Sequence, residues 1–203
     1  MITIIDLDIG NVNSVSKALK YLKVDHKITK NPDDIIKADK IIFPGVGSFH
    51  EASKRIKQSQ IKDVLKKRVL EDKIPILGIC LGMQLLATTG EEVKKSDGLD
   101  FVKGNVSLLR SSKIGMRLPH IGWNDVTFKN FKLFDSIKNG SCFYFVHSYE
   151  LIPQEDVKVA YTNYGIDYAA ALQKENILGV QFHPEKSQNV GLRLLKNFCE
   201  GIY

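Results

Sequence analysis

The first 90 residues alternate short, mainly apolar runs with segments whose apolar residues recur at helical spacing. The runs Ile2–Leu7, Ile41–Phe43 and Ile74–Ile79 have the length and composition of buried strands. Between the first two, Val12–Leu22 carries apolar residues at the spacing of one helix face. This order predicts an α/β fold, in which helices flank an open, mostly parallel sheet.

Further elements of this half are predicted from the same patterns. A short strand is expected at 26–29, a helix at 33–38, helical segments over much of 51–71, and a helix at 83–87.

After residue 100 the pattern changes to several short segments with turn residues between them. They predict added strands, largely antiparallel, that extend the same sheet or lie across it. A buried strand at 177–182 and a closing helix follow, and no linker or repeat interrupts the chain. We therefore expect one domain over residues 1–203. The short segments are 105–109, 123–128, 142–149, 157–161 and 169–173.

The composition excludes several classes of protein. With 43% hydrophobic and 26% charged residues, the chain has the make-up of an ordinary globular protein. Its apolar runs are far shorter than the roughly 18 residues that cross a bilayer. The start, Met1–Asp6, lacks the features of a signal peptide. Three cysteines without a CxxC pair indicate no disulfide framework, so a cytoplasmic location is expected.

The formal charge of +6 raises the question of nucleic acid. However, the basic residues are scattered, and the short groups Lys66–Arg68 and Lys94–Lys95 stand beside acidic neighbours. A nucleic-acid interface needs a clustered basic stripe. We therefore expect neither nucleic acid nor a membrane as a partner.

The segment Gly78–Gly82 contains the residue best suited to chemistry, Cys80. A strand that enters a helix through a tight turn, with glycines on both sides, has the pattern of a nucleophile elbow with cysteine in place of serine. The glycines let neighbouring chain approach, and the following helix N-terminus favours a thiolate. The common alternative, a buried structural cysteine, is kept for Cys142 and Cys199.

A thiolate nucleophile needs a base, and the base needs an orienting acid. In Gln181–Ser187, His183 and Glu185 stand two residues apart in a stretch that Pro184 biases toward extended backbone. Side chains at i and i+2 share one side of a strand, so the carboxylate can reach the imidazole. The other histidines carry weaker signals.

The glycine-rich end of the third strand, Pro44–Gly47, can turn backbone N–H groups toward a developing oxyanion. By itself this is a weak signal, because a plain turn has the same composition. Its position one α/β unit before Cys80 gives it weight.

Together, GICLGMQ, the PGVG loop and the distal HPEKS resemble the class I (triad-type) glutamine amidotransferases. Within that class, the segments at 119–124, 144–149, 181–187 and 191–198 are most similar to the glutaminase subunits of imidazole glycerol phosphate synthase, the HisH family. The resemblance runs over essentially the whole chain.

The resemblance implies a role for each matching residue. Cys80 would be the nucleophile, His183 the base and general acid, and Glu185 its orienter. The backbone N–H of Leu81, with that of Val46 or Gly47 after a loop adjustment, would form the oxyanion hole. The residues matching those that hold the substrate glutamine are Gln84 and Glu92. No metal or organic cofactor is implied.

The resemblance also implies a partner. The family passes ammonia to a separate HisF-like (β/α)8-barrel cyclase, which makes imidazole glycerol phosphate and AICAR in histidine biosynthesis. The two chains form a heterodimer, which is a hydrolase in its glutaminase chain and a lyase as a complex. The positions matching its interface are Asn11, Trp123, Tyr144, His147 and Lys186. Each has a bland alternative, which for Tyr144 is packing in the core.

Three departures from the family pattern stand out. Asp8 and Asp100 replace glycines, and the segment Glu91–Lys95 lacks the usual glycines after its acids. Either the first loop differs in geometry or Asp8 adopts a left-handed conformation. Two of the three lie in loops that could face a partner or shape glutamine entry. This leaves a second pathway open: a paralogue that supplies ammonia to another synthase, such as one that aminates a sugar of surface glycans.

Two hypotheses from other classes remain. A cysteine hydrolase or protease-like member of the same fold would not need glutamine, and it leaves Gln84 and Lys186 unexplained. A non-catalytic binding subunit would not need the intact set of Cys80, His183 and Glu185.

Overall fold

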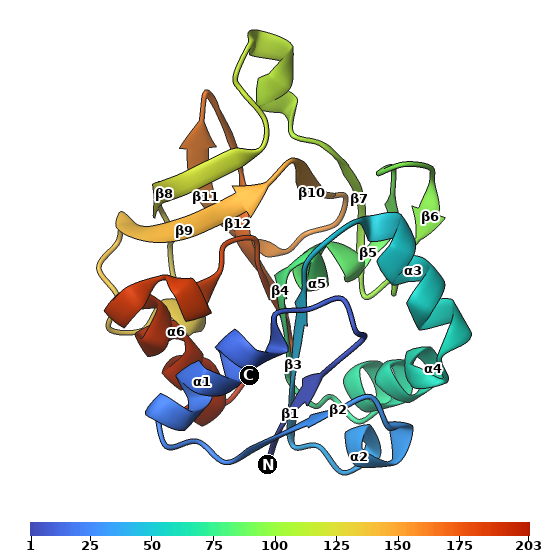
Figure 1. Cartoon of the computed structure of the whole chain (residues 1–203). Helices are drawn as coiled ribbons and strands as arrows, with labels where there is room; N and C mark the ends of the chain where they lie inside the picture. The colour runs from blue at the N-terminus through green and yellow to red at the C-terminus, as the bar shows by residue number, and fades with distance from the viewer.

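The computed structural model describes all 203 residues and is built on a seven-stranded sheet (Figure 1). The strand order is β11-β12-β13-β4-β3-β1-β2. The last five of these strands run parallel, and β12 and β11 continue the sheet antiparallel at one edge. The bounds are β1 Ile2–Ile5, β2 His26–Thr29, β3 Lys40–Gly45, β4 Ile76–Cys80, β11 Lys158–Tyr164, β12 Ile166–Lys174 and β13 Ile177–Val180.

Helices cover both faces of the sheet, and each face has its own hydrophobic core (Figure 1). The helices α1 (Val12–Tyr21) and α6 (Gln188–Glu200) lie on one face, where an aromatic cluster fills the space beneath them. The other face carries α2 (Pro32–Ile36), α3 (Phe49–Gln58), α4 (Ile61–Lys66) and α5 (Leu81–Leu85). The predicted α/β class, with a mostly parallel sheet between helices, is confirmed.

The second half of the chain adds strands in both of the predicted ways. Besides β11 and β12, it builds a four-stranded sheet in the order β10-β7-β5-β6 and a separate pair of strands, β8 and β9. These sheets lie above the end of the main sheet at which β4 gives way to α5 (Figure 1). Their bounds are β5 Ala87–Gly90, β6 Ser96–Asp97, β7 Val102–Leu108, β8 His120–Val126, β9 Ser141–His147 and β10 Tyr149–Pro153.

Most predicted elements are present with their bounds moved by a few residues, and two of the differences have a clear cause. The helix expected at 83–87 begins and ends earlier, because the N–H groups of Leu99 and Phe101 bind the carbonyls of Leu85 and Leu86 and draw the chain into β5. The strand expected at 142–149 is divided at Ser148, and its two parts join different sheets. Both differences arise from pairing with distant chain, which local spacing does not encode.

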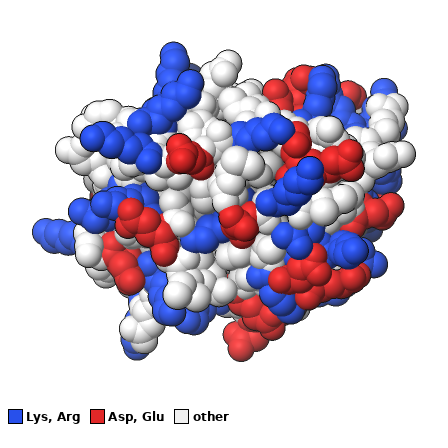
Figure 2. Space-filling view, turned by 90° about the horizontal axis from the view of Figure 1, so that it is seen from below, with Lys and Arg blue, Asp and Glu red and all other residues white.

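The surface carries both signs of charge. On the face seen in Figure 2, lysine and arginine side chains alternate with aspartate and glutamate. No helix has the length and apolar character needed to span a membrane.

Candidate active site

Cys80 is the last residue of β4 and immediately precedes α5. Its backbone has φ 54° and ψ −111°, a positive φ that a non-glycine residue adopts only under constraint. Such strain costs of order 1–3 kcal/mol and is concentrated at functional sites. The elbow predicted from the glycine spacing is thus present, with the cysteine at its apex.

Two glycines make this turn possible. A Cβ at Gly82 would lie 1.7 Å from the carbonyl oxygen of Phe43, and a Cβ at Gly78 would lie 2.7 Å from the backbone of Gly82. Both distances are far below van der Waals contact, so any larger residue would push the chain apart. The predicted close approach of neighbouring backbone is confirmed.

His183 follows β13 and lies beside the end of β4, because β13 and β4 are neighbouring parallel strands. Its Nδ1 donates to Glu185 Oε1 at 2.8 Å, and the two side chains are each 2% exposed. The backbone is held in place by His183 N–H, which donates to Tyr144 O at 2.8 Å. The bond to Glu185 leaves Nε2 as the ring nitrogen free to act on Cys80.

The electrostatics of this pair favour the imidazolium. Burial alone disfavours the charged ring, but its interactions with Cys80 and Glu185 outweigh burial and raise the pKa of His183 to about 10. His183 Nε2 is buried and makes no hydrogen bond with suitable geometry in this structure. A Cys80 thiolate would satisfy it.

The other two cysteines are in different surroundings. The exposed Cys142 donates to Asp125 Oδ1 at 2.7 Å, and that hydrogen bond raises the pKa of Cys142. Burial raises the pKa of Cys199 to about 12. Both environments favour the unreactive thiol.

A cavity of about 560 Å³ opens in front of Cys80. It lies between the carboxyl ends of the central strands and the small sheets above them, the usual place for a site in an open α/β sheet. Its lining brings together most of the residues predicted from the sequence. The lining residues are Val46, Gly47, Ser48, Cys80, Leu81, Gln84, Glu92, Pro119, Val146, His147, Ser148, Tyr149, His183 and Lys186.

Gln84 and Glu92 line this cavity from α5 and from the loop after β5. Glu92 Oε2 accepts from the backbone N–H of Phe49 at 2.7 Å, at the start of α3, which fixes the carboxylate. Gln84 Nε2 donates to Tyr149 O at 2.9 Å and to Gln181 Oε1 at 3.1 Å. With both of its N–H bonds used inside the protein, Gln84 has its Oε1 available to a ligand.

The loop after β3 places Val46 and Gly47 on the cavity wall. Val46 N–H donates to Ile9 O at 2.8 Å, so it is occupied in this conformation. Gly47 has φ 99°, and no heavy atom lies within 4 Å of the place where its Cβ would be. This positive φ is one that glycine adopts readily.

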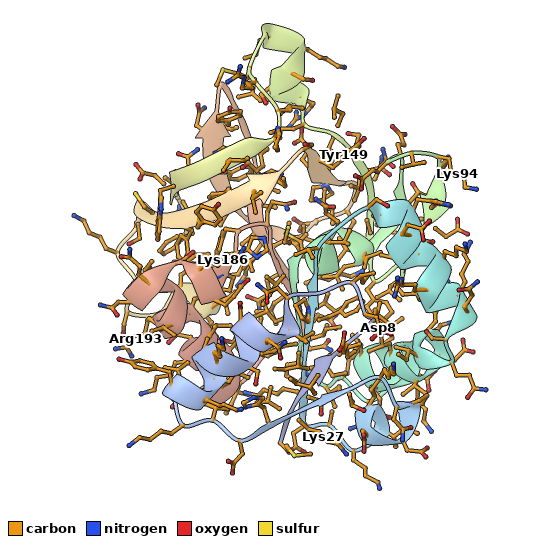
Figure 3. All side chains as sticks on the ribbon, viewed as in Figure 1. Asp8, Lys27, Lys94, Tyr149, Lys186 and Arg193 are labelled. Atoms are coloured by element: carbon orange, nitrogen blue, oxygen red, sulfur yellow. The ribbon has the colours of Figure 1, made fainter.

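The five residues predicted to face a partner fall into two groups. Trp123 is 47% exposed and packs edge to face against the partly exposed Tyr144, and Lys186 Nζ lies 5.8 Å from the centre of the Tyr144 ring. Lys186 lies between β9 and the start of α6 (Figure 3). Tyr144 therefore faces away from the core. Asn11 is exposed, and its Oδ1 accepts from Ser14 N–H as the N-cap of α1.

His147, by contrast, is buried in a hydrogen-bonded chain behind the cavity. His147 Nδ1 donates to Tyr149 O at 2.8 Å, so its Nε2 accepts from Tyr168 O–H at 2.9 Å. Tyr168 Oη in turn accepts from His120 Nδ1 at 2.8 Å. Burial lowers the pKa of His147 to about 3 and that of His120 to about 4, so both rings are neutral.

Two residues of the site were not predicted from the sequence as functional. Tyr168 is brought to the two histidines by β12, and nothing in its local sequence signals that contact. Gln181 lies two residues before His183, and its Nε2 donates to Cys80 Sγ at 3.7 Å. The sequence predicts extended backbone from His183 to Glu185, but Glu185 lies in a short 3₁₀ turn, Pro184–Lys186, and this turn brings its carboxylate to the ring. The strand argument therefore gives no local signal for Gln181.

The loop segments that depart from the family pattern each contain a residue with positive φ. Asp8 and Asp100 have φ of 58° and 60°, the left-handed region that glycine adopts without cost. Asp8 thus adopts the left-handed conformation, which was one of the two alternatives predicted from the sequence. Val93, beside Glu92, has φ 66° and is 79% exposed, and Lys94 N–H closes a tight turn onto Glu92 O.

No cluster of three or more His, Cys, Asp or Glu side chains is arranged to hold a metal ion. The groups gathered at Cys80 are a thiol, an imidazole and a carboxylate, which are the groups that nucleophilic catalysis uses.

Comparisons with known proteins show the family of the chain. The family model for class-I glutamine amidotransferases matches residues 3–202. The chain is 46% identical over 199 residues to the imidazole glycerol phosphate synthase subunit HisH 1 of Campylobacter jejuni (strain RM1221), covering 98% of each chain. It is 48% identical over 200 residues to the HisH subunit of Pyrococcus furiosus, covering 97% of each.

Solved structures support the same fold. One glutamine amidotransferase crystal structure aligns with a TM-score of 0.77 at 21% identity, covering 98% of this chain and 97% of the other. The structure of PurLQS from Thermotoga maritima aligns with a TM-score of 0.75 at 17% identity, covering 97% and 96%. At these identities the likeness concerns the fold alone. From its full-length match to the family model and to the HisH relatives, the chain belongs to the class I glutamine amidotransferases, within the HisH family.

Proposed function

We propose that this chain is the glutaminase subunit of an imidazole glycerol phosphate synthase and hydrolyses L-glutamine to glutamate and ammonia. The observation that carries the proposal is the convergence of Cys80 and the His183–Glu185 pair on one cavity. The full-length identity to HisH proteins supports the assignment to this synthase.

Each residue would have a defined part in the reaction. Cys80, as the thiolate, attacks the side-chain carboxamide of glutamine, and His183 protonates the departing ammonia. His183 then activates water, which hydrolyses the glutamyl thioester and releases glutamate. Glu185 keeps the imidazole in the tautomer that presents Nε2 to the reacting atoms.

The cavity offers matching groups for the rest of the substrate. The carboxylate of Glu92, fixed by the N–H of Phe49, suits the α-ammonium of glutamine by its charge. Gln84 would use the oxygen that remains free of internal hydrogen bonds.

The oxyanion of the tetrahedral intermediate needs two N–H donors, and we assign the first to Leu81 at the start of α5. The second would come from Val46 or Gly47. Because Val46 N–H is bound to Ile9 O, it becomes available only after the loop rearranges. We infer that binding of the synthase partner and its ligand promotes this rearrangement, so that glutamine is not hydrolysed without need.

Ammonia released into water at neutral pH would be mainly ammonium, which is not nucleophilic. We therefore propose that it passes to a (β/α)8-barrel cyclase in a heterodimer. The exposed group of Trp123, Tyr144 and Lys186, with Asn11, would form the contact surface, and His147 would lie behind it at the cavity wall.

The direct test is an assay of glutamate release from glutamine by the purified chain, alone and with a cyclase partner and its ligand. We expect low activity alone and strong stimulation in the complex. Hydrolysis of peptides in place of glutamine would favour the cysteine-hydrolase hypothesis and contradict the proposal.

We keep a second pathway as an alternative to histidine biosynthesis, because several relatives carry numbered names. The proteins from Campylobacter jejuni and Methanococcus maripaludis are named HisH 1, and one from Vibrio vulnificus is named HisH 2. A numbered set leaves room for a paralogue that supplies ammonia to a different synthase, such as one that aminates a glycan sugar. Growth of a histidine auxotroph that lacks its own HisH distinguishes the two, because only a histidine enzyme restores growth.

A further inference from the structure

Gln181 is a buried polar residue that the mechanism above does not use. Its side chain has no exposure to solvent, yet its carboxamide contacts two residues of the site. Nε2 donates to Cys80 Sγ at 3.7 Å, and Oε1 accepts from Gln84 Nε2 at 3.1 Å. Burying a carboxamide is unfavourable unless both of its ends are hydrogen-bonded, so these contacts account for its presence here.

The sheet places Gln181 beside the nucleophile. Val180 is paired with Ile79 across the parallel strands β13 and β4, so the residues that follow them, Gln181 and Cys80, are neighbours at the strand ends. Beyond β13 the chain bends at Gln181 and Phe182, and the side chains of Gln181 and His183 both lie beside Cys80. Between them, the buried Phe182 stacks on Phe143, with ring centres 4.1 Å apart, which holds this part of the chain in place.

The orientation of the Gln181 amide follows from its neighbours. The backbone carbonyl of Tyr149 can only accept, so the amide nitrogen of Gln84 must face it. The same nitrogen donates to Gln181, which must therefore present its oxygen to Gln84. The NH₂ group of Gln181 is left to face the sulfur of Cys80.

A donor in this position acts differently on the two forms of Cys80. As a thiol, Cys80 can direct its proton to Val146 O, 4.0 Å from Sγ. As a thiolate, it loses that interaction, whereas the hydrogen bond from Gln181 becomes charge-assisted and stronger. We infer that Gln181 is a positioning residue for the nucleophile: it orients the Cys80 sulfur and stabilises it in the reactive thiolate form. This inference rests on the proposed function. It adds a second hydrogen-bond donor to the Cys80 sulfur, besides His183.

The test compares two substitutions of Gln181 with a matched control. Gln181→Met keeps the volume and removes the donor, and Gln181→Glu replaces the donor with a carboxylate. The control is Asn176→Leu, because Asn176 is a buried amide that donates to Val69 O and Ile74 O at the opposite end of β13. It removes a comparable pair of hydrogen bonds away from the cavity.

The measurement is the rate at which iodoacetamide alkylates Cys80 across pH in the full chain, followed by mass spectrometry of the Cys80 peptide. We expect the midpoint of this profile to rise by about one pH unit in Gln181→Met, as the loss of a hydrogen bond to a charged group implies. The midpoint should rise further in Gln181→Glu. The control Asn176→Leu should lower the stability of the protein and leave the midpoint unchanged. Profiles of both Gln181 variants that coincide with that of the unchanged protein would overturn the inference.

Kinetics in the synthase complex provide a second readout. We expect Gln181→Met to lower kcat about tenfold at neutral pH, with recovery at higher pH and little change in KM. A raised KM with unchanged kcat would mean that Gln181 acts only by holding Gln84, which contradicts a role at the nucleophile. A different result would show that the proposed function itself is wrong. In that case, alkylation of Cys80 in the protein without substitutions would leave glutamate release intact.

Discussion

His183 and Glu185 form a hydrogen-bonded pair that is almost sealed from solvent, with Nδ1 and Oε1 2.8 Å apart. The turn after Pro184 brings the carboxylate back toward the ring of the residue two positions before it. Because Glu185 also helps to raise the pKa of His183, beside the larger effect of Cys80, the carboxylate influences both the tautomer and the charge of the imidazole.

Glu185→Gln should therefore lower kcat for glutamate release by roughly 10²- to 10⁴-fold with a smaller change in KM, because a neutral amide no longer stabilises the imidazolium. Steady-state kinetics in the complex measure this. Glu175→Gln is the control, since Glu175 is exposed and pairs only with Lys73. Equal activities of the two variants would contradict the assignment of Glu185.

Cys80→Ala should abolish glutamine-dependent synthase activity while leaving the activity with added ammonium salts unchanged, because ammonia then reaches the cyclase directly. Cys199→Ala, at the far end of α6, should retain both activities. Residual glutaminase activity in Cys80→Ala above the background of the preparation would remove the basis of the mechanism.

Stability should decrease as the pH falls below about 6.5, because His120 and His147 are buried as neutral rings with lowered pKa values. The unfolded chain takes up protons at these residues near pH 6.5, and the folded chain does so only near pH 3–4. Each histidine contributes a slope of up to about 1.4 kcal/mol per pH unit to the free energy of unfolding.

His183 does not add to this slope. Its pKa is raised, so its stabilising effect is complete below about pH 6.5 and is lost only as the pH rises toward 10. Urea unfolding between pH 7 and pH 5 measures the effect, and His120→Gln should reduce the slope. A free energy of unfolding that stays constant over this range would show that the two rings are not buried as neutral groups.

Val93→Gly should stabilise the protein by about 1 kcal/mol, because Val93 is a β-branched residue with φ 66° and its exposed side chain loses little packing. Thermal unfolding measures the gain. The same test applies to Asp8, at φ 58°: Asp8→Gly should be more stable than Asp8→Ala by a similar amount. If Val93→Gly is less stable than the unchanged protein, strain at this turn is not the dominant effect.

Much of the fold could be predicted because its signals are local. The strand at 26–29 and the helix that begins at Val12 have the predicted positions, since each is specified by the period of its own apolar residues. The end of α5 and the break at Ser148 could not be predicted, because they depend on pairing with residues more than ten positions away. Local patterns contain no information on such partners.

The site shows the same division. The sequence by itself determined that Cys80 stands at an elbow between glycines and that His183 and Glu185 are close, because both features lie within a few residues of chain. Only the tertiary structure decided that β13 lies beside β4 and brings Gln181 to the sulfur of Cys80. It also decided that Val46 N–H is bound to Ile9 and that Tyr168 joins two distant histidines. The physical reason is that a buried polar atom takes the partner that the assembled sheets bring to it, whatever its distance along the chain.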